Sequence, residues 1–178
     1  FRSFWIVQSD LMKQDLINKF NNNSDSKVLI HPFYPPLNHF SKVSTLRTPK
    51  SFLYVSTYQP HKNFENLINA FKLFYDEYKK GELHLTLVNN DSKIIVKINN
   101  LILNGYPIIN HGFIKRDSLT SLYRQSEFII YPSLLESFGL GIIEGLENGC
   151  KVIGADLPYT YAVCKPSITF NPKLVKSI

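Results

Sequence analysis

Cysteine is scarce in this sequence, and long apolar runs and arginine-rich tracts are absent. The two cysteines, Cys150 and Cys164, have neither metal-ligand spacing nor a companion cluster, so we interpret both as reduced thiols, buried or half-buried. No apolar run approaches the length of a membrane span, and no secretory signal is visible. No Arg-rich tract or aromatic–basic repeat accompanies the net charge of +6, so we do not expect a nucleic-acid partner.

The remaining composition is that of an ordinary globular domain. Hydrophobic residues make up 44% of the 178 residues and charged residues 19%, which is enough for one full core. The modest positive charge fits an anionic membrane surface or anionic substrates, but a solvated basic face is the commoner cause. The chain begins with Phe1, and its only methionine is Met12, so we expect it to be a piece of a longer protein.

The alternation of strands and helices predicts the fold class. Apolar runs predict strands at 4–7, 27–30, 51–56, 83–88, 107–109, 128–131, 151–155 and 168–170. Apolar residues at helical spacing follow Ser9, Asn63 and Asp117, each of which can cap a helix. A helix is also predicted at 91–103 and in the stretch after Gly139. Residues 32–50 contain four prolines and no clear period, which indicates a linker. We therefore expect an α/β fold with a doubly wound, parallel, Rossmann-like sheet.

One strand–loop–helix unit, residues 128–149, organises the candidate site. Its apolar run, typical of a strand buried on both faces, ends at Pro132, and a helix begins within residues 139–141. The loop lies at the carboxyl end of a parallel strand, where open α/β sheets bind ligands. The free N–H groups of residues 139–141 suit a phosphate. The carboxylates of Glu136, in the loop, and Glu144, on the second helical turn, suit hydroxyl groups of a sugar and of a ribose.

The residues Glu136-Ser-Phe-Gly-Leu-Gly-Ile-Ile-Glu144 resemble the Glu-x7-Glu motif of the retaining glycosyltransferases of family 4, which have the GT-B fold. The resemblance covers the chain from about Ser51 to Pro172. It implies that Glu144 holds the donor ribose and that Glu136 contacts the donor sugar. The other residues implied at the donor belong to the helix start: Phe138, Gly139, Leu140 and Gly141. The alternative is that two surface acids simply lie near a helix start.

Two further segments are implied to meet the donor. Lys62 lies between a strand end and a helix start, where a cation beside free amides suits a diphosphate. The segment His61-Lys62-Asn63 is similar to a basic loop of the family. The resemblance also implies that Gly112 and Ile114 border the nucleobase through backbone groups, at the end of a strand beside the central one. His111 has no visible partner in the sequence, and we expect it to be structural.

The resemblance implies transfer of a sugar from a nucleotide sugar, with Lys62 and Glu136 in the catalytic roles and without a metal or other cofactor. Residues 1–26 are then the end of an N-terminal domain, and residues 27–178 are the nucleotide-sugar-binding, C-terminal half of a GT-B enzyme. The acceptor, a glycan or lipid-linked acceptor in surface polysaccharide synthesis, is expected on the N-terminal domain, so this chain alone should bind donor without turnover. A cytoplasmic location is implied, with peripheral attachment at the inner face of the membrane as an alternative.

Two other functions stay open at this point. A sugar-nucleotide epimerase of the non-hydrolysing GT-B type would need catalytic acids and a histidine at other places, which we do not find. A non-catalytic GT-B module that binds a nucleotide or a partner is favoured slightly by Thr57, where many members have Arg, and by Ala162, where Glu is usual. The intact glutamate pair and the lysine argue against it. Two smaller departures, Gly141 for the usual Pro and Gly145 for the usual Ala, leave the turn possible.

Overall fold

The computed structural model describes residues 4–20, 27–31, 46–88 and 93–178, and its main element is a parallel sheet of six strands. The strand order is β5-β4-β3-β6-β7-β8, and every pairing is parallel. The strands are β3 (Thr48–Tyr54), β4 (Glu82–Leu85), β5 (Ile108–Asn110), β6 (Ser126–Tyr131), β7 (Lys151–Ala155) and β8 (Ile168–Phe170). The predicted α/β class and the parallel sheet are therefore confirmed.

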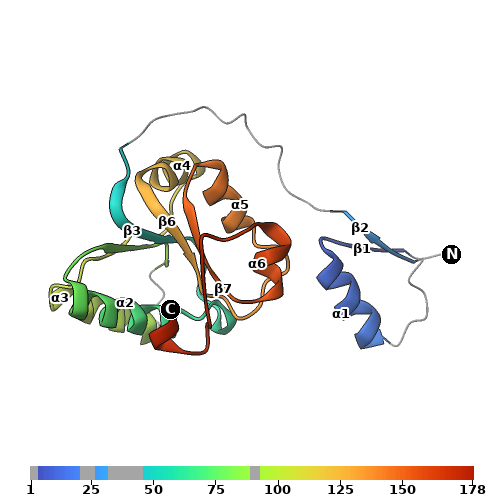
Figure 1. Cartoon of the computed structure of the whole chain (residues 1–178), viewed down its shortest axis with the longest axis horizontal. Helices are drawn as coiled ribbons and strands as arrows, with labels where there is room; N and C mark the ends of the chain where they lie inside the picture. Colours follow the sequence, from blue (N-terminus) through green and yellow to red (C-terminus); the bar gives the residue numbers. More distant parts are fainter. Residues whose placement is uncertain (1–3, 21–26, 32–45, 89–92) are drawn as a thin grey trace.

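The strand order places β3 and β6 side by side in the middle of the sheet. The chain runs outward from β3 to the edge strand β5, returns through α4 (Arg116–Gln125) to β6, and runs outward again to β8. Because parallel crossovers are right-handed, this reversal puts α2 (Phe64–Tyr78) and α3 (Lys93–Leu103) on one face. It puts α4, α5 (Leu140–Glu147) and α6 (Pro158–Val163) on the other (Figure 1). The carboxyl ends of β3 and β6 thus form a topological switch point, where open sheets bind ligands.

Apolar side chains fill both faces of the two central strands. Leu53 of β3 is fully buried, and Ile129 and Ile130 of β6, which point to opposite faces, are 2% and 6% exposed. The buried side of α2 repeats at helical spacing and consists of Phe64, Leu67, Ile68, Ala70 and Phe71. Burial of each large apolar side chain stabilises the fold by roughly 1.5–3 kcal/mol. The central position of β6 explains the unbroken apolar run at residues 128–131.

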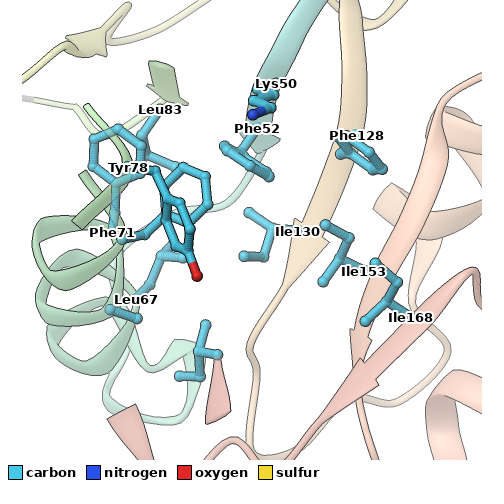
Figure 2. A pocket seen from close by; sticks show the side chains of 13 residues that line it. Lys50, Phe52, Leu67, Phe71, Tyr78, Leu83, Phe128, Ile130, Ile153 and Ile168 are labelled. Atoms are coloured by element: carbon cyan, nitrogen blue, oxygen red, sulfur yellow. The ribbon is translucent and has the colours of Figure 1, made fainter. Parts of the chain in front are cut away.

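An apolar cavity of about 380 Å³ lies between α2 and the face of the sheet that α2 covers (Figure 2). Aromatic side chains of α2 line one wall, and Phe128, Ile130, Ile153 and Ile168 of β6, β7 and β8 line the other. None of the residues predicted to bind the donor lines this cavity. It is therefore separate from the predicted ligand site.

A second, two-stranded parallel sheet comes from β1 (Trp5–Val7) and β2 (Val28–Ile30). Between them, α1 (Asp10–Phe20) begins after Ser9, whose Oγ accepts a hydrogen bond from the Met12 amide at 3.3 Å, so the predicted cap is confirmed. Within the described residues, no pairing joins β2 to the main sheet. The division of the chain into domains near Lys27 stays a prediction.

The predicted linker 32–50 differs from the structure at its end, because β3 already begins at Thr48; residues 32–45 lie outside the described residues. The pairing of β3 with β6 is irregular between Thr48 and Phe52. Pro49 has no N–H to donate, and the Lys50 amide donates instead to the Glu127 carboxylate at 2.7 Å. This irregular first half of the strand hides its period in the sequence.

Two helix starts differ from prediction, and a third helix starts where it was predicted but without the expected side-chain cap. The N-cap residue of α4 is Lys115, so Asp117 lies inside the first turn. Helix α6 occupies 158–163, where the sequence analysis predicted no helix; Pro158 stands at its start, where a fixed φ favours a helix. Asn63 precedes α2, but its backbone is left-handed, with φ 59°, and its side chain makes no capping hydrogen bond. The predicted start of α3 at residues 91–92 lies outside the described residues.

Candidate functional site

Hydrogen bonds join the loops that follow β3 and β6 at the carboxyl edge of the sheet. The Leu134 amide donates to the His61 carbonyl at 2.7 Å. Tyr54, the last residue of β3, is fully buried, and its hydroxyl lies 3.0 Å from the Lys62 carbonyl oxygen and 2.9 Å from Ser133 Oγ. Buried hydroxyl groups require such partners. These contacts therefore fix the two loops relative to each other.

Lys62 and Glu136 form an ion pair across these loops. Lys62 Nζ lies 2.6 Å from Glu136 Oε1, and the two side chains are 16% and 9% exposed. The sequence predicted each residue at the donor separately, and the structure brings them together across 74 positions of chain. The lysine keeps two further N–H donors for an anion, and the carboxylate keeps acceptor sites for hydroxyl groups.

Asn63 ties the same loops to the C-terminal part of the chain. Its amide nitrogen donates to the Pro132 carbonyl at 3.0 Å and to the Pro172 carbonyl at 2.7 Å. Asn63 is only 8% exposed, so both donors are used where water is scarce. The side chain predicted to cap α2 therefore supports the position of its neighbour Lys62.

The first turn of α5 provides amides that have no acceptor within the helix. Gly139 is the N-cap residue, with φ 81° and ψ 45°, in the region that favours glycine. The amides of Leu140 and Gly141 follow it at the positive end of the helix dipole. Phe138, half-buried, precedes them. The predicted helix start is therefore present, and its contact with a phosphate stays a prediction.

Glu144 lies one turn further along α5 and accepts a hydrogen bond from Tyr123 of α4. The Tyr123 hydroxyl is 3.0 Å from Glu144 Oε2. Glu147 lies three residues later, and its Oε1 is buried without a partner among the described residues. Burial, and then the charge of Glu144, raise the pKa of Glu147, while Arg116 acts in the opposite direction. The Glu144 carboxylate is thus held by a neutral donor beside a second acidic group.

Gly112 and Ile114 follow β5, which is an edge strand. The prediction that this strand lies beside β6 is wrong: β4 and β3 separate them, because the chain reverses direction only after β5. Gly112 has φ 64°, and a Cβ atom there would meet only the Leu87 carbonyl oxygen, at 3.9 Å. Its backbone is therefore open to close approach, whereas the Ile114 side chain packs against the core.

Side chains beside Gly112 hold the ends of β4 and β5 together. The Asn110 amide group accepts from the Leu87 N–H at 2.9 Å and donates to the Leu87 carbonyl at 3.0 Å. His111 Nε2 lies 2.9 Å from His84 Nδ1, and His84 Nε2 lies 2.8 Å from a Glu82 carboxylate oxygen. Burial, and then His84, lower the pKa of His111. The network agrees with the structural role expected for His111.

In the part of the chain that the structure describes, no three His, Cys, Asp or Glu side chains are placed to hold a metal ion. The expectation of a metal-free site stays a prediction.

None of the described helices is both long and apolar enough to cross a membrane. Both cysteines are free, Cys150 buried and Cys164 half-buried.

Three supporting residues were not among those predicted for the site: Tyr54, Ser133 and Tyr123. Each acts through a side chain that meets a residue far away in the sequence, so spacing along the chain carries no signal for it. One signal was available for the tyrosines, because a tyrosine in an apolar segment usually finds a partner for its hydroxyl. That signal does not say which partner it finds.

Comparison with known proteins identifies the family. The family model described as Glycosyl transferases group 1 matches residues 38–166. The serotype-specific mannosyltransferase WbdA of Escherichia coli is 28% identical over 125 residues, 67% of this chain and 15% of WbdA. The O-antigen chain mannosyltransferase RfbU of Salmonella typhimurium is 25% identical over 168 residues, 92% of this chain and 46% of RfbU. The chain thus spans less than half the length of these curated relatives.

The fold is found among solved glycosyltransferases. The pneumococcal O-GlcNAc transferase GtfA, crystallised with UDP and GlcNAc, matches with a TM-score of 0.79 and 22% identity, over 98% of this chain and 36% of GtfA. At that identity the likeness shows the fold alone, which is that of the GT-B glycosyltransferases. Since the family model covers more than half of its length, this chain belongs to the glycosyl transferases group 1 family.

Proposed function

We propose that this chain is the donor-binding, C-terminal domain of a retaining glycosyltransferase of family 4. The whole enzyme would move a hexosyl group from a nucleotide sugar to a glycan or lipid-linked acceptor held by its other domain. Mannose is the first candidate sugar, because WbdA and RfbU are both named as mannosyltransferases. O-antigen synthesis is the first candidate process, because RfbU is named for the O-antigen chain. Such an enzyme would work in the cytoplasm, at or near the inner face of the membrane.

The observation that carries the proposal is the Lys62–Glu136 ion pair at the carboxyl edge of β3 and β6. A nucleotide sugar carries a diphosphate next to a ring rich in hydroxyl groups, so its site needs a cation and a hydrogen-bond acceptor at neighbouring positions. The ion pair supplies both, 2.6 Å apart. Lys62 would contact the diphosphate, and Glu136 would accept hydrogen bonds from the sugar.

The same groups would stabilise departure of the nucleoside diphosphate. When the bond between the anomeric carbon and the diphosphate oxygen breaks, negative charge grows on the diphosphate. Lys62 and the amides of Leu140 and Gly141 would neutralise that charge, so the proposal needs no metal ion. Glu136 would hold the sugar as its ring becomes positive, and Glu144 would accept hydrogen bonds from the ribose.

A binding panel tests this proposal. The full chain is titrated with UDP, GDP, their nucleosides, GDP-mannose and UDP-GlcNAc, by thermal shift and then by calorimetry. We expect one nucleoside diphosphate and its sugar to bind. Glu136→Gln should weaken the nucleotide sugar more than the nucleoside diphosphate, whereas Glu144→Gln should weaken both.

Two results would contradict the proposal. A folded chain that binds no member of the panel would favour a non-catalytic module, in line with Thr57 at a position where many family members have Arg. Turnover by the isolated chain, above that of a Glu144→Ala control, would contradict the assignment of the acceptor site to another domain.

A further inference from the structure

The hydrogen bond between Tyr123 and Glu144 joins two helices that lie next to each other on one face of the sheet (Figure 1). Tyr123 lies near the end of α4, and Glu144 lies in the middle of α5. Within the described part of the chain, the Tyr123 hydroxyl is the one donor to this carboxylate, at 3.0 Å from Oε2. The other oxygen, Oε1, receives no hydrogen bond from the described residues.

Tyr123 is itself held in place through its backbone. Its carbonyl oxygen accepts hydrogen bonds from Arg47 Nη1 at 3.1 Å and from Cys150 Sγ at 2.9 Å. Arg47 also donates to the carbonyl groups of Ser126 and Asn148. Burial raises the pKa of Cys150 to about 11, so this thiol keeps the proton that it donates. With its side chain 2% exposed, Tyr123 presents its hydroxyl from a fixed position.

The direction of the hydrogen bond is also determined. Burial, and then the charge of Glu144, raise the pKa of Tyr123 far above its usual range, so the hydroxyl keeps its proton at any physiological pH. An ionised carboxylate can only accept. Glu144 Oε2 therefore accepts the hydrogen bond that the Tyr123 hydroxyl donates, and Oε1 stays available to a ligand.

We infer that Tyr123 is a positioning residue, which holds Glu144 so that Oε1 meets the ribose hydroxyl groups of the donor. The inference rests on the proposed function, which assigns the ribose to Glu144. A glutamate that is free to rotate loses side-chain entropy when a ligand fixes it. A hydrogen bond that is already made in the unliganded chain reduces that loss. Tyr123 thus increases the discrimination between ribose and deoxyribose without touching the ligand.

The experiment compares UDP with dUDP, and GDP with dGDP, by calorimetry on the full chain. The wild type should prefer the ribonucleotide by about tenfold or more. Tyr123→Phe keeps the buried ring and removes the hydroxyl, so the preference should fall to about threefold or less, with affinity for the deoxynucleotide unchanged. A merely structural role would weaken both nucleotides alike. Tyr106→Phe is the matched control, because the Tyr106 hydroxyl also donates to a carboxylate, that of Asp76, at 2.8 Å. This variant should keep the full preference for the ribonucleotide.

A Glu144→Gln variant distinguishes failure of the inference about Tyr123 from failure of the proposed role of Glu144. If it removes the preference while Tyr123→Phe retains it in full, the inference is overturned and the proposed function stands. If the wild type binds both nucleotides equally, or neither, the proposed role of Glu144 fails and the inference fails with it. If Tyr123→Phe does not fold, a crystal structure of the wild type with UDP or GDP, whichever binds, decides. A Tyr123 hydroxyl turned away from Glu144 in that complex overturns the inference. A hydrogen bond retained between Tyr123 and Glu144 Oε2, with Glu144 Oε1 in contact with the ribose, supports it.

Discussion

A Cβ atom on Gly145 would lie 2.6 Å from Ile129 Cδ1 and 2.7 Å from Ile129 Cγ2. Helix α5 therefore packs so closely on β6 that a methyl group at this position would force the Ile129 side chain to shift. One turn earlier, a Cβ atom on Gly141 would lie 3.0 Å from Tyr131 Cε2. Ile129 and Tyr131 share one face of β6, and the two glycines share one face of α5. The two glycines that depart from the family pattern thus match two large side chains on the neighbouring strand.

Gly145→Ala should lower the free energy of unfolding by about 1–3 kcal/mol, which is the usual cost of overpacking, although alanine favours helices. In an Ile129→Ala background, Gly145→Ala should raise the free energy of unfolding, because the new methyl group then fills the space that the isoleucine side chain left. Urea unfolding of the four proteins measures both effects. An equal effect of Gly145→Ala in the two backgrounds would show that Ile129 does not set the helix position.

Lys62→Ala should weaken the binding of a nucleoside diphosphate about tenfold or more and change nucleoside binding little, since a charge-assisted hydrogen bond contributes about 1.5–3 kcal/mol. Lys151→Ala is the control: Lys151 also pairs with a glutamate, Glu127, at 2.9 Å, but at the amino end of the sheet. Calorimetry with UDP and uridine, or GDP and guanosine, measures the difference. Equal weakening of nucleotide and nucleoside would mean that Lys62 only holds Glu136.

Asn63→Asp should lower the free energy of unfolding by about 1–3 kcal/mol, because a carboxylate cannot donate to two buried carbonyl groups. Aspartate caps helices as well as asparagine does and also tolerates left-handed backbone, so a capping role predicts little loss. Asn66→Asp is the matched control: Asn66 donates one bond, at 3.1 Å, to the Pro172 carbonyl, and should cost less. Urea unfolding at neutral pH compares the three proteins.

The thermal stability of the chain should fall as the pH drops from 7.5 to 5.5, in part through His111. Burial and His84 lower the pKa of His111 in the folded chain, so below about pH 6.5, the ordinary value, the unfolded chain binds more protons. Stability is therefore lost as the pH falls through the folded pKa. His111→Gln should show a smaller loss than the wild type in thermal unfolding at the two pH values. The same loss in both proteins would show that His111 is not responsible.

Local patterns predicted elements well where one face, or both faces, of the element are buried. The strands predicted at 151–155 and 168–170 have those bounds in the structure, and α2 buries the face that its spacing indicates. The patterns failed where a contact with a distant segment replaced the interaction that the local sequence favours. Asn63 is a good capping residue by type, but its amide group reaches two carbonyl groups of other segments. The position of β5 at the sheet edge also depends on where the chain reverses direction, and side-chain periodicity does not indicate that.

The sequence by itself determined the α/β class, the parallel sheet, and the strand–loop–helix unit that carries Glu136 and Glu144, because side-chain period and turn residues act within a few positions. Only the tertiary structure decided that Lys62 meets Glu136, that Tyr123 donates a hydrogen bond to Glu144, and that Gly145 lies closely against Ile129. Those contacts join segments far apart in the chain. They depend on strand order and on the distance between helix and sheet, which are set by packing of the whole core and not by any short stretch of residues.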